Sequence, residues 1–100
     1  MLFFEVSSTK GMQRTVKTSD LFNRRLSQVD RRIEIMVDAV RNRNFKAFAE
    51  LTMKDSNQFH ATCLDSYPPI HYLNGTSFEI IDFVHEFNGH EVKYALPKNC

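Results

Sequence analysis

The sequence contains few of the residues that break, cross-link or anchor a chain. Its 100 residues include three glycines, three prolines, two cysteines and no tryptophan. So few glycines and prolines leave little room for disordered linkers, and Cys63 and Cys100 alone cannot build a disulfide framework. No run approaches the ~20 apolar residues of a membrane-spanning helix, and the opening MLFFEV is too short for a secretory signal. We therefore expect a cytoplasmic protein.

The sequence also lacks an excess of charge of either sign. Thirteen basic and twelve acidic residues give a formal net charge of +1. Such a balance creates no long-range field that would attract nucleic acid or a membrane surface, and we expect neither partner. A cluster of arginines alternates with acidic residues, which is typical of a solvated helix face. Nucleic-acid binding through this cluster is the weaker alternative, and it would be sensitive to salt. The cluster comprises Arg24, Arg25, Arg31 and Arg32.

What is present is an ordinary globular composition, with 42% apolar and 25% charged residues. One hundred residues make one small domain with a modest core. The run Leu2–Val6 predicts a short buried strand, because consecutive apolar residues are followed by small polar ones. A short helix is expected from Gly11 to Thr18, and a second helix begins at Ser19 and Asp20, where a hydroxyl or carboxylate caps free backbone amides.

Three longer helices follow from apolar spacing. The first carries one buried stripe with spacings of mainly three and four residues: Phe22, Leu26, Val29, Ile33, Met36, Val37 and Val40. Asn44 is expected to cap the next helix, which ends near Leu64 or Asp65 because Pro68 and Pro69 cannot continue it. Asn74-Gly75 predicts a turn and Thr76–Glu79 a capping box. The last helix has the buried stripe Ile80, Ile81, Val84 and Phe87.

The segment Glu91–Ala95 is expected to form a weak final strand. The predicted order is therefore a strand, three or four helices and a short strand, which indicates an α+β fold with helices against a sheet. Two strands do not make a stable sheet alone. Either the domain pairs with another copy, or the remaining strands lie on sequence outside these residues.

The segment VSSTKGM, residues 6–12, places hydroxyls, a lysine and a glycine where the predicted strand gives way to a helix. Backbone amides at a helix N-terminus bind phosphate oxygens, so an anion site is one interpretation and a plain helix cap is the other. The segment lacks the glycine spacing of a P-loop.

The stretch Met53–Ile70 has short neutral polar residues among apolar ones, which indicates a helix packed on most sides. His60 and Cys63 lie three residues apart, so a metal pair or an activated thiolate is conceivable. Each lacks the further ligands or partners that such a site needs, and a packed polar helix is the simpler interpretation. Asp55 and Asp65 are candidate carboxylates without a specific placement.

Two segments, VSSTKGMQRTVKTSDL and ELTMKDSNQFHATCLDSYPPIHYLN, together resemble the diphosphomevalonate decarboxylases of the GHMP kinase superfamily. The resemblance runs from about Val6 to about Tyr94, and Thr9 makes it closer to eukaryotic members. It implies a single partial domain over residues 1–100, similar to the first part of the family's C-terminal domain, without the N-terminal ATP-binding domain.

The resemblance implies a function in the mevalonate pathway. The family converts mevalonate diphosphate to isopentenyl diphosphate, with ATP and Mg²⁺, and its full-length members are expected to be homodimers. It also assigns substrate binding to Ser8 with its neighbours Ser7, Thr9, Gly11 and Met12, while Lys10 carries no family role. A possible pocket helix bears Asp55, Ser56, Asn57 and His60. No metal ligand is carried over, and neither ATP nor Mg²⁺ is expected to bind these residues tightly.

The resemblance fails at the last six residues. After Val92-Lys93-Tyr94 the family continues with a segment of the form Thr-Phe-Asp-Ala-Gly-Pro-Asn-Ala, which holds the catalytic aspartate, whereas this sequence reads ALPKNC. No catalytic residue is therefore assigned. The leading hypothesis is a decarboxylase fragment that is inactive alone. The alternative is a noncatalytic module that associates with itself or with the full-length enzyme through an open sheet edge.

Overall fold

The fold is entirely helical over the residues that the structure describes. The computed structural model describes residues 2–93, with side chains from Lys10 onward. Four α-helices account for its regular structure: α1 (Leu2–Thr18), α2 (Asp20–Arg41), α3 (Phe45–Leu64) and α4 (Gly75–Phe87). None of these helices is both long and apolar enough to cross a membrane.

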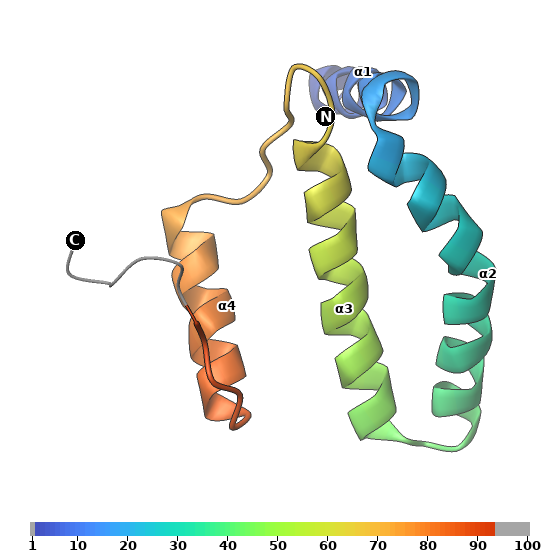
Figure 1. Ribbon diagram of the computed structural model, residues 1–100, viewed down its shortest axis with the longest axis vertical. Helices are drawn as coiled ribbons and strands as arrows, with labels where there is room; N and C mark the ends of the chain where they lie inside the picture. Colours follow the sequence, from blue (N-terminus) through green and yellow to red (C-terminus); the bar gives the residue numbers. More distant parts are fainter. Residues whose placement is uncertain (1, 94–100) are drawn as a thin grey trace.

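Three of the helices form a flat layer. Helices α2, α3 and α4 lie side by side, and α1 crosses one end of α2 and α3 (Figure 1). A tight turn joins α2 to α3, with Arg43 at a φ of 52°. An irregular segment of residues 65–74 joins α3 to α4. Grooves run between α2 and α3 and between α3 and α4. Because the three helices lie side by side, the layer has two broad faces.

The predicted α+β fold is wrong for the described residues, which contain no strand. Leu2–Val6 lies in the first turns of α1. Short apolar runs do not distinguish a strand from a helix by periodicity. A strand also needs a neighbour for its backbone hydrogen bonds, whereas a helix satisfies its own. In the second predicted strand, residues 91–93 have no regular structure and residues 94 and 95 lie outside the described residues.

Most predicted helix ends are confirmed. Ser19 caps α2, since its hydroxyl accepts a hydrogen bond from the Phe22 amide at 3.1 Å. Asn44 caps α3 by accepting from the Ala47 amide at 3.1 Å. Helix α3 ends at Leu64, ahead of the two prolines.

The start of α4 differs from its prediction by two residues. Asn74 is the cap, and Ser77 rather than Glu79 completes the capping box. The Asn74 carboxamide oxygen accepts from the Ser77 amide at 3.0 Å, and the Ser77 hydroxyl accepts from the Asn74 amide at 3.3 Å. An asparagine caps a helix at least as well as a threonine does, and Asn74 takes the role that was predicted for Thr76.

The predicted stripe of α2 is buried only in part. Phe22, Val29 and Met36 are half-buried. Leu26, Ile33 and Val40 remain 55%, 55% and 59% exposed. Helix α3 contacts α2 on one side of the stripe, where Arg25, Gln28 and Arg32 also point. Among the described residues the buried apolar side chains are Ala39, Leu51 and Cys63.

The segment after α3 fixes the corner between α1 and α2. The Asp65 carboxylate accepts from the Ser19 hydroxyl at 2.8 Å and from the Leu21 amide at 3.1 Å. These hydrogen bonds, the Leu21 amide first, lower the pKa of Asp65. The Thr15 and Ser66 hydroxyls lie 2.8 Å apart in a buried hydrogen bond. Asp65 thus brings a negative charge to the N-terminus of α2, where the helix dipole favours it.

Replacing the cap of α2 tests this corner. Ser19→Ala removes the bond to the Phe22 amide and the bond to Asp65, so it should lower the free energy of unfolding by about 1 kcal/mol or more. Urea denaturation followed by circular dichroism measures the change. Ser27→Ala is the matched control, because Ser27 is exposed and inside the same helix; its effect should stay within about 0.5 kcal/mol. Equal effects of the two variants would contradict the capping role.

Candidate functional site

The segment predicted to bind substrate lies inside α1. Ser7, Ser8 and Thr9 fall in its middle, and their side chains are outside the described part of the structure. Because α1 begins at Leu2, the backbone amides of residues 7–12 are not the free amides of a helix N-terminus. The helix-start geometry expected for an anion site is therefore wrong here.

A cavity of about 160 Å³ opens beside Met12, where α1, α2, α3 and Tyr72 meet. Of the residues predicted to bind substrate, Met12 lines this cavity. Gly11 lies next to it, and a Cβ atom at Gly11 would be 3.4 Å from the Tyr72 hydroxyl oxygen, an ordinary contact distance. The full lining comprises Met12, Thr15, Phe22, Arg25, Phe59, Thr62, Cys63 and Tyr72.

The polar groups of this cavity already have partners. The Thr15 hydroxyl pairs with Ser66, and the Thr62 hydroxyl donates to the Gln58 carbonyl at 2.8 Å. Burial raises the pKa of the Cys63 thiol, which keeps it protonated. Arg25 is the cation in the lining, and its guanidinium is bound elsewhere, as described next. The cavity is therefore better suited to an apolar group than to a diphosphate.

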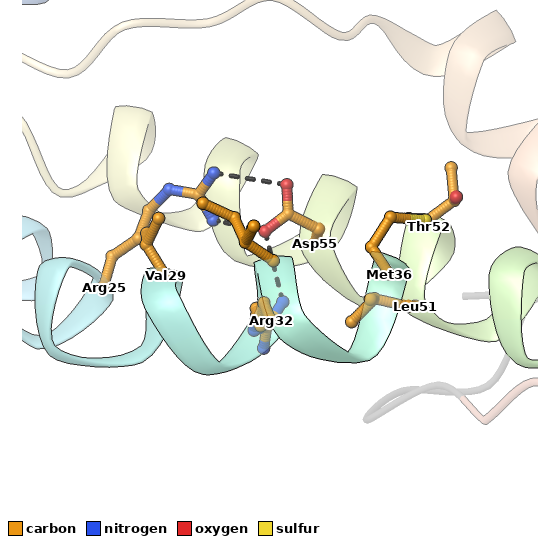
Figure 2. A pocket seen from close by; sticks show the side chains of 8 residues that line it. Arg25, Val29, Arg32, Met36, Leu51, Thr52 and Asp55 are labelled. Atoms are coloured by element: carbon orange, nitrogen blue, oxygen red, sulfur yellow. Dashed lines mark hydrogen bonds and ion pairs between the residues drawn. The ribbon is translucent and has the colours of Figure 1, made fainter. Parts of the chain in front are cut away.

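Arg25 and Arg32 of α2 converge on Asp55 of α3 (Figure 2). Arg25 Nη1 and Nη2 donate to the two carboxylate oxygens at 2.8 and 3.2 Å, and Arg32 Nη1 donates to Oδ1 at 3.3 Å. Arg25 also donates to Gln58, which in turn donates to Gln28 at 2.6 Å. The Arg25 hydrogen bond is the main cause that lowers the pKa of Asp55. Two cations thus hold this carboxylate ionised and oriented.

The sequence interpretation missed the role of these two arginines. Arg25 and Arg32 were assigned to a solvated face, with nucleic-acid binding as the alternative, yet both point across the helix pair. Arg25 also lies over the Phe59 ring, 5.8 Å from its centroid. The sequence did contain an indication of this role, because the two arginines are seven residues apart and therefore lie on the same face of the helix. Asp55 on the neighbouring helix supplies the opposite charge.

The four residues of the predicted pocket helix do not converge. Asp55 points toward α2, whereas Ser56 and Asn57 line the groove between α3 and α4. His60 Nδ1 lies 2.7 Å from the Ser56 carbonyl oxygen on its own helix. These side chains therefore lie on two sides of α3.

The conceivable pairing of His60 with Cys63 is not formed. His60 is bound to Ser56, and the buried Cys63 thiol has a raised pKa, opposite to that of an activated thiolate. Over the described range, no group of three or more histidine, cysteine, aspartate or glutamate side chains is placed to hold a metal ion. The carboxylate of Asp65, for its part, serves the α2 cap.

Comparisons with known proteins agree on one family. The model of the mevalonate 5-diphosphate decarboxylase C-terminal domain matches residues 4–96. The diphosphomevalonate decarboxylase of Candida albicans is 57% identical over 92 residues, which cover 91% of this chain and 25% of the relative. A crystal structure of mevalonate 5-diphosphate decarboxylase at 2.3 Å resolution aligns with a TM-score of 0.77 and 50% identity, over 83% of this chain and 22% of that one.

Two further solved structures with this fold concern ligand binding. One concerns mevalonate diphosphate mediated ATP binding by the decarboxylase from Enterococcus faecalis, with a TM-score of 0.78 and 26% identity, over 82% of this chain and 26% of that one. The other is a complex of MDDEF with MVAPP, AMPPCP and magnesium, with a TM-score of 0.78 and 24% identity. It covers 90% of this chain and 29% of its own, and it supports the fold alone.

These matches identify both the kind of domain and the family. The fold and the matched domain model place the chain among the C-terminal domains of decarboxylases. The chain belongs to the mevalonate 5-diphosphate decarboxylase family. It spans about a quarter of the length of the curated relative from Candida albicans.

The lowered pKa of Asp55 predicts acid sensitivity. A carboxyl with a lowered folded pKa stabilises the fold at pH values above its unfolded pKa, about 4, and that contribution is lost as the pH falls through the folded pKa. Asp55→Asn should therefore lower stability at pH 7, by less than about 1 kcal/mol for this part-exposed group, and flatten the loss of stability below pH 4. Urea titrations at several pH values measure both effects.

Asp30→Asn is the control for this prediction, because Asp30 is an exposed aspartate on α2, the helix that carries the two arginines. It should leave the acid profile as steep as in the unmodified chain. An Asp55→Asn profile that coincides with the unmodified one would show that the arginine contacts do not stabilise the fold.

Proposed function

We propose that this chain is a helical portion of a diphosphomevalonate decarboxylase that does not catalyse the reaction alone. The complete enzyme would convert mevalonate diphosphate to isopentenyl diphosphate, with ATP and Mg²⁺, in the cytoplasm. The observation that carries the proposal is 57% identity to a diphosphomevalonate decarboxylase over 25% of that relative's length. A segment that matches a quarter of an enzyme contributes to a site rather than containing it.

The chemistry of the described residues supports inactivity of the chain alone. A general base must hold a free lone pair near the reacting proton. Asp55 is bound by two arginines, and Asp65 is bound by the Ser19 hydroxyl and the Leu21 amide. Both carboxylates thus make structural hydrogen bonds, and neither lines the cavity at Met12. The cavity at Met12 supplies one cation, Arg25, which is already neutralised by Asp55.

Substrate binding at residues 7–12 remains our proposal for the complete enzyme. Met12 lines a cavity between three helices and is itself 67% exposed, so this part of α1 borders a cavity that opens to solvent. Ser8 is the proposed binding residue, with Ser7, Thr9 and Gly11 beside it. A helix that starts earlier than expected lacks the free amides that would strengthen such a site, which favours weak substrate binding by this chain.

An assay of the purified chain tests the catalytic part of the proposal. Incubated with mevalonate diphosphate, ATP and Mg²⁺, the chain should release no CO₂ above the rate without protein. The Candida albicans enzyme, at equal concentration, is the positive control. Turnover within about a hundredfold of that control would overturn the proposal that this chain is inactive.

The second candidate function is a noncatalytic interaction module. The sheet edge first suggested for it is not found among the described residues, but a different feature favours the module. Large apolar side chains are exposed on every helix whose side chains are described; Phe87, for example, is 82% exposed. Such surfaces are typical of sites that contact another protein. Association with a second copy or with a full-length decarboxylase, itself proposed to be a homodimer, is the function that this feature supports.

A further inference from the structure

Two histidines meet at the C-terminal end of α4. His85 lies in the last turn of the helix, and His90 lies in the segment after it, where the chain turns back (Figure 1). Their Nδ1 atoms are 3.0 Å apart and their ring centroids 5.3 Å apart, with the ring planes inclined by 36°. His85 is half-buried and His90 is exposed. The pair lies apart from the cavity at Met12, whose lining contains neither residue.

The backbone at the end of α4 fixes this contact. Asn88 is the C-cap of the helix, and Gly89 follows it in the left-handed conformation with a φ of 84°. The His90 amide donates to the His85 carbonyl at 2.9 Å, and the Gly89 amide donates to the Glu86 carbonyl at 3.0 Å. These two hydrogen bonds form a Schellman motif, which brings the side chain two residues beyond the cap against the one three residues before it. Apolar side chains commonly make that contact, whereas here both are imidazoles.

The contact between the two rings is compatible with only some protonation states. A hydrogen bond between the two Nδ1 atoms of His85 and His90 needs a proton on one of them and a lone pair on the other. Two fully protonated rings would repel each other. Two rings that carry their protons on Nε2 would present two lone pairs to the same small space. A cation that accepts both lone pairs stabilises this last arrangement.

We propose that His85 and His90 together bind a divalent transition-metal ion, with Cu²⁺ preferred. Imidazole is a ligand for Cu²⁺, Ni²⁺ and Zn²⁺, and a given set of ligands generally binds Cu²⁺ most tightly. Two nitrogen atoms that are each about 2.05 Å from an ion and at right angles are about 2.9 Å apart. This separation is close to the 3.0 Å between the two Nδ1 atoms. Tetrahedral Zn²⁺ would need about 3.3 Å, whereas right angles are typical of Cu²⁺.

Binding of the ion requires a turn of each ring and a shift of one proton. Each lone pair must point to an ion beside the line that joins the two Nδ1 atoms, rather than along that line. The χ2 torsion of histidine is broad, so this turn costs little. The ring that carries its proton on Nδ1 gives it up to water and takes one on Nε2, so a neutral pair releases no net proton.

The charges around the pair favour a cation. The helix dipole places partial negative charge at the C-terminus of α4. Glu86 and Glu91 follow the two histidines directly in the sequence. From α3, Glu50 and Lys46 line the cavity of about 300 Å³ that His90 borders, so this helix contributes one charge of each sign. With two protein ligands, water fills the remaining positions, as in a site that exchanges its ion rather than a closed structural site.

Titration of the 100-residue chain with Cu²⁺ tests the proposal. Cys100→Ser is present throughout, so that the terminal thiol neither binds nor reduces the ion. Calorimetry should give one ion per chain, and electron paramagnetic resonance should show splitting from two nitrogen nuclei. His85→Ala and His90→Ala should each weaken binding roughly tenfold or more, because either change removes the gain from linking two ligands. His71→Ala, which removes an exposed imidazole elsewhere, is the control and should change the affinity less than about twofold.

Substitutions at Gly89 test whether the turn prepares the pair. Gly89→Ala disfavours the left-handed conformation, so it should weaken Cu²⁺ binding severalfold while both histidines are kept. Gly89→Asn is the matched variant, because asparagine adopts that conformation more readily. It should bind Cu²⁺ more tightly than Gly89→Ala does. Equal affinities for glycine, alanine and asparagine at this position would overturn the role of the turn.

Three results would overturn the metal site itself. They are splitting from a single nitrogen nucleus, loss of affinity in only one of the His85→Ala and His90→Ala variants, and an equal loss in His71→Ala. Tighter binding of Zn²⁺ than of Cu²⁺ would overturn the preference drawn from the 3.0 Å separation. Mg²⁺, which prefers oxygen ligands, should not compete for the site. None of these results bears on the CO₂ assay, because the histidine pair is independent of the proposed function.

Discussion

The contact between α2 and α3 is the constraint on which the rest of the structure depends. The two helices form an antiparallel pair (Figure 1), and polar side chains connect residues 25–32 of α2 to residues 55–58 of α3. Asp55 binds two arginines of α2 at the middle of the pair, and Asp65 caps α2 from beyond the end of α3. Because few apolar side chains are buried, directional polar contacts set the register of this pair. Helix α1 and the loop at Tyr72 then pack over its end.

The long helices could be predicted from the sequence, whereas the strand predicted at Leu2–Val6 was wrong. The caps Ser19 and Asn44 and the proline stop after α3 are local signals, and the structure confirms them. The run Leu2–Val6 fits a strand or a helix equally well, and only the availability of a partner strand decides between them. The sequence shows which residues are apolar, but which of them become buried depends on how the helices pack against one another.

Only part of the candidate site could be predicted, because local sequence patterns do not show which helices pair. Met12 was expected at a binding site and does line a cavity. A recognisable sequence pattern is formed by Asp55, Ser56, Asn57 and His60. Residues that are adjacent in a helical sequence nevertheless point to different sides of the helix. Their separation therefore followed from helix geometry alone. The engagement of Asp55 by Arg25 and Arg32 needed the pairing of α2 with α3, which no local signal specifies.

The cap that Asp65 provides has a consequence for how the chain opens. Ser19 and Asp65 are 46 residues apart in sequence, so the bond between them closes a long loop. Closing that loop costs conformational entropy, and this cost is met when α2 and α3 come together. The hydrogen bonds of Asp65 to Ser19 and Leu21 form only after that step. The start of α2 and the end of α3 should therefore exchange their amide hydrogens as one cooperative unit, with α4 opening separately.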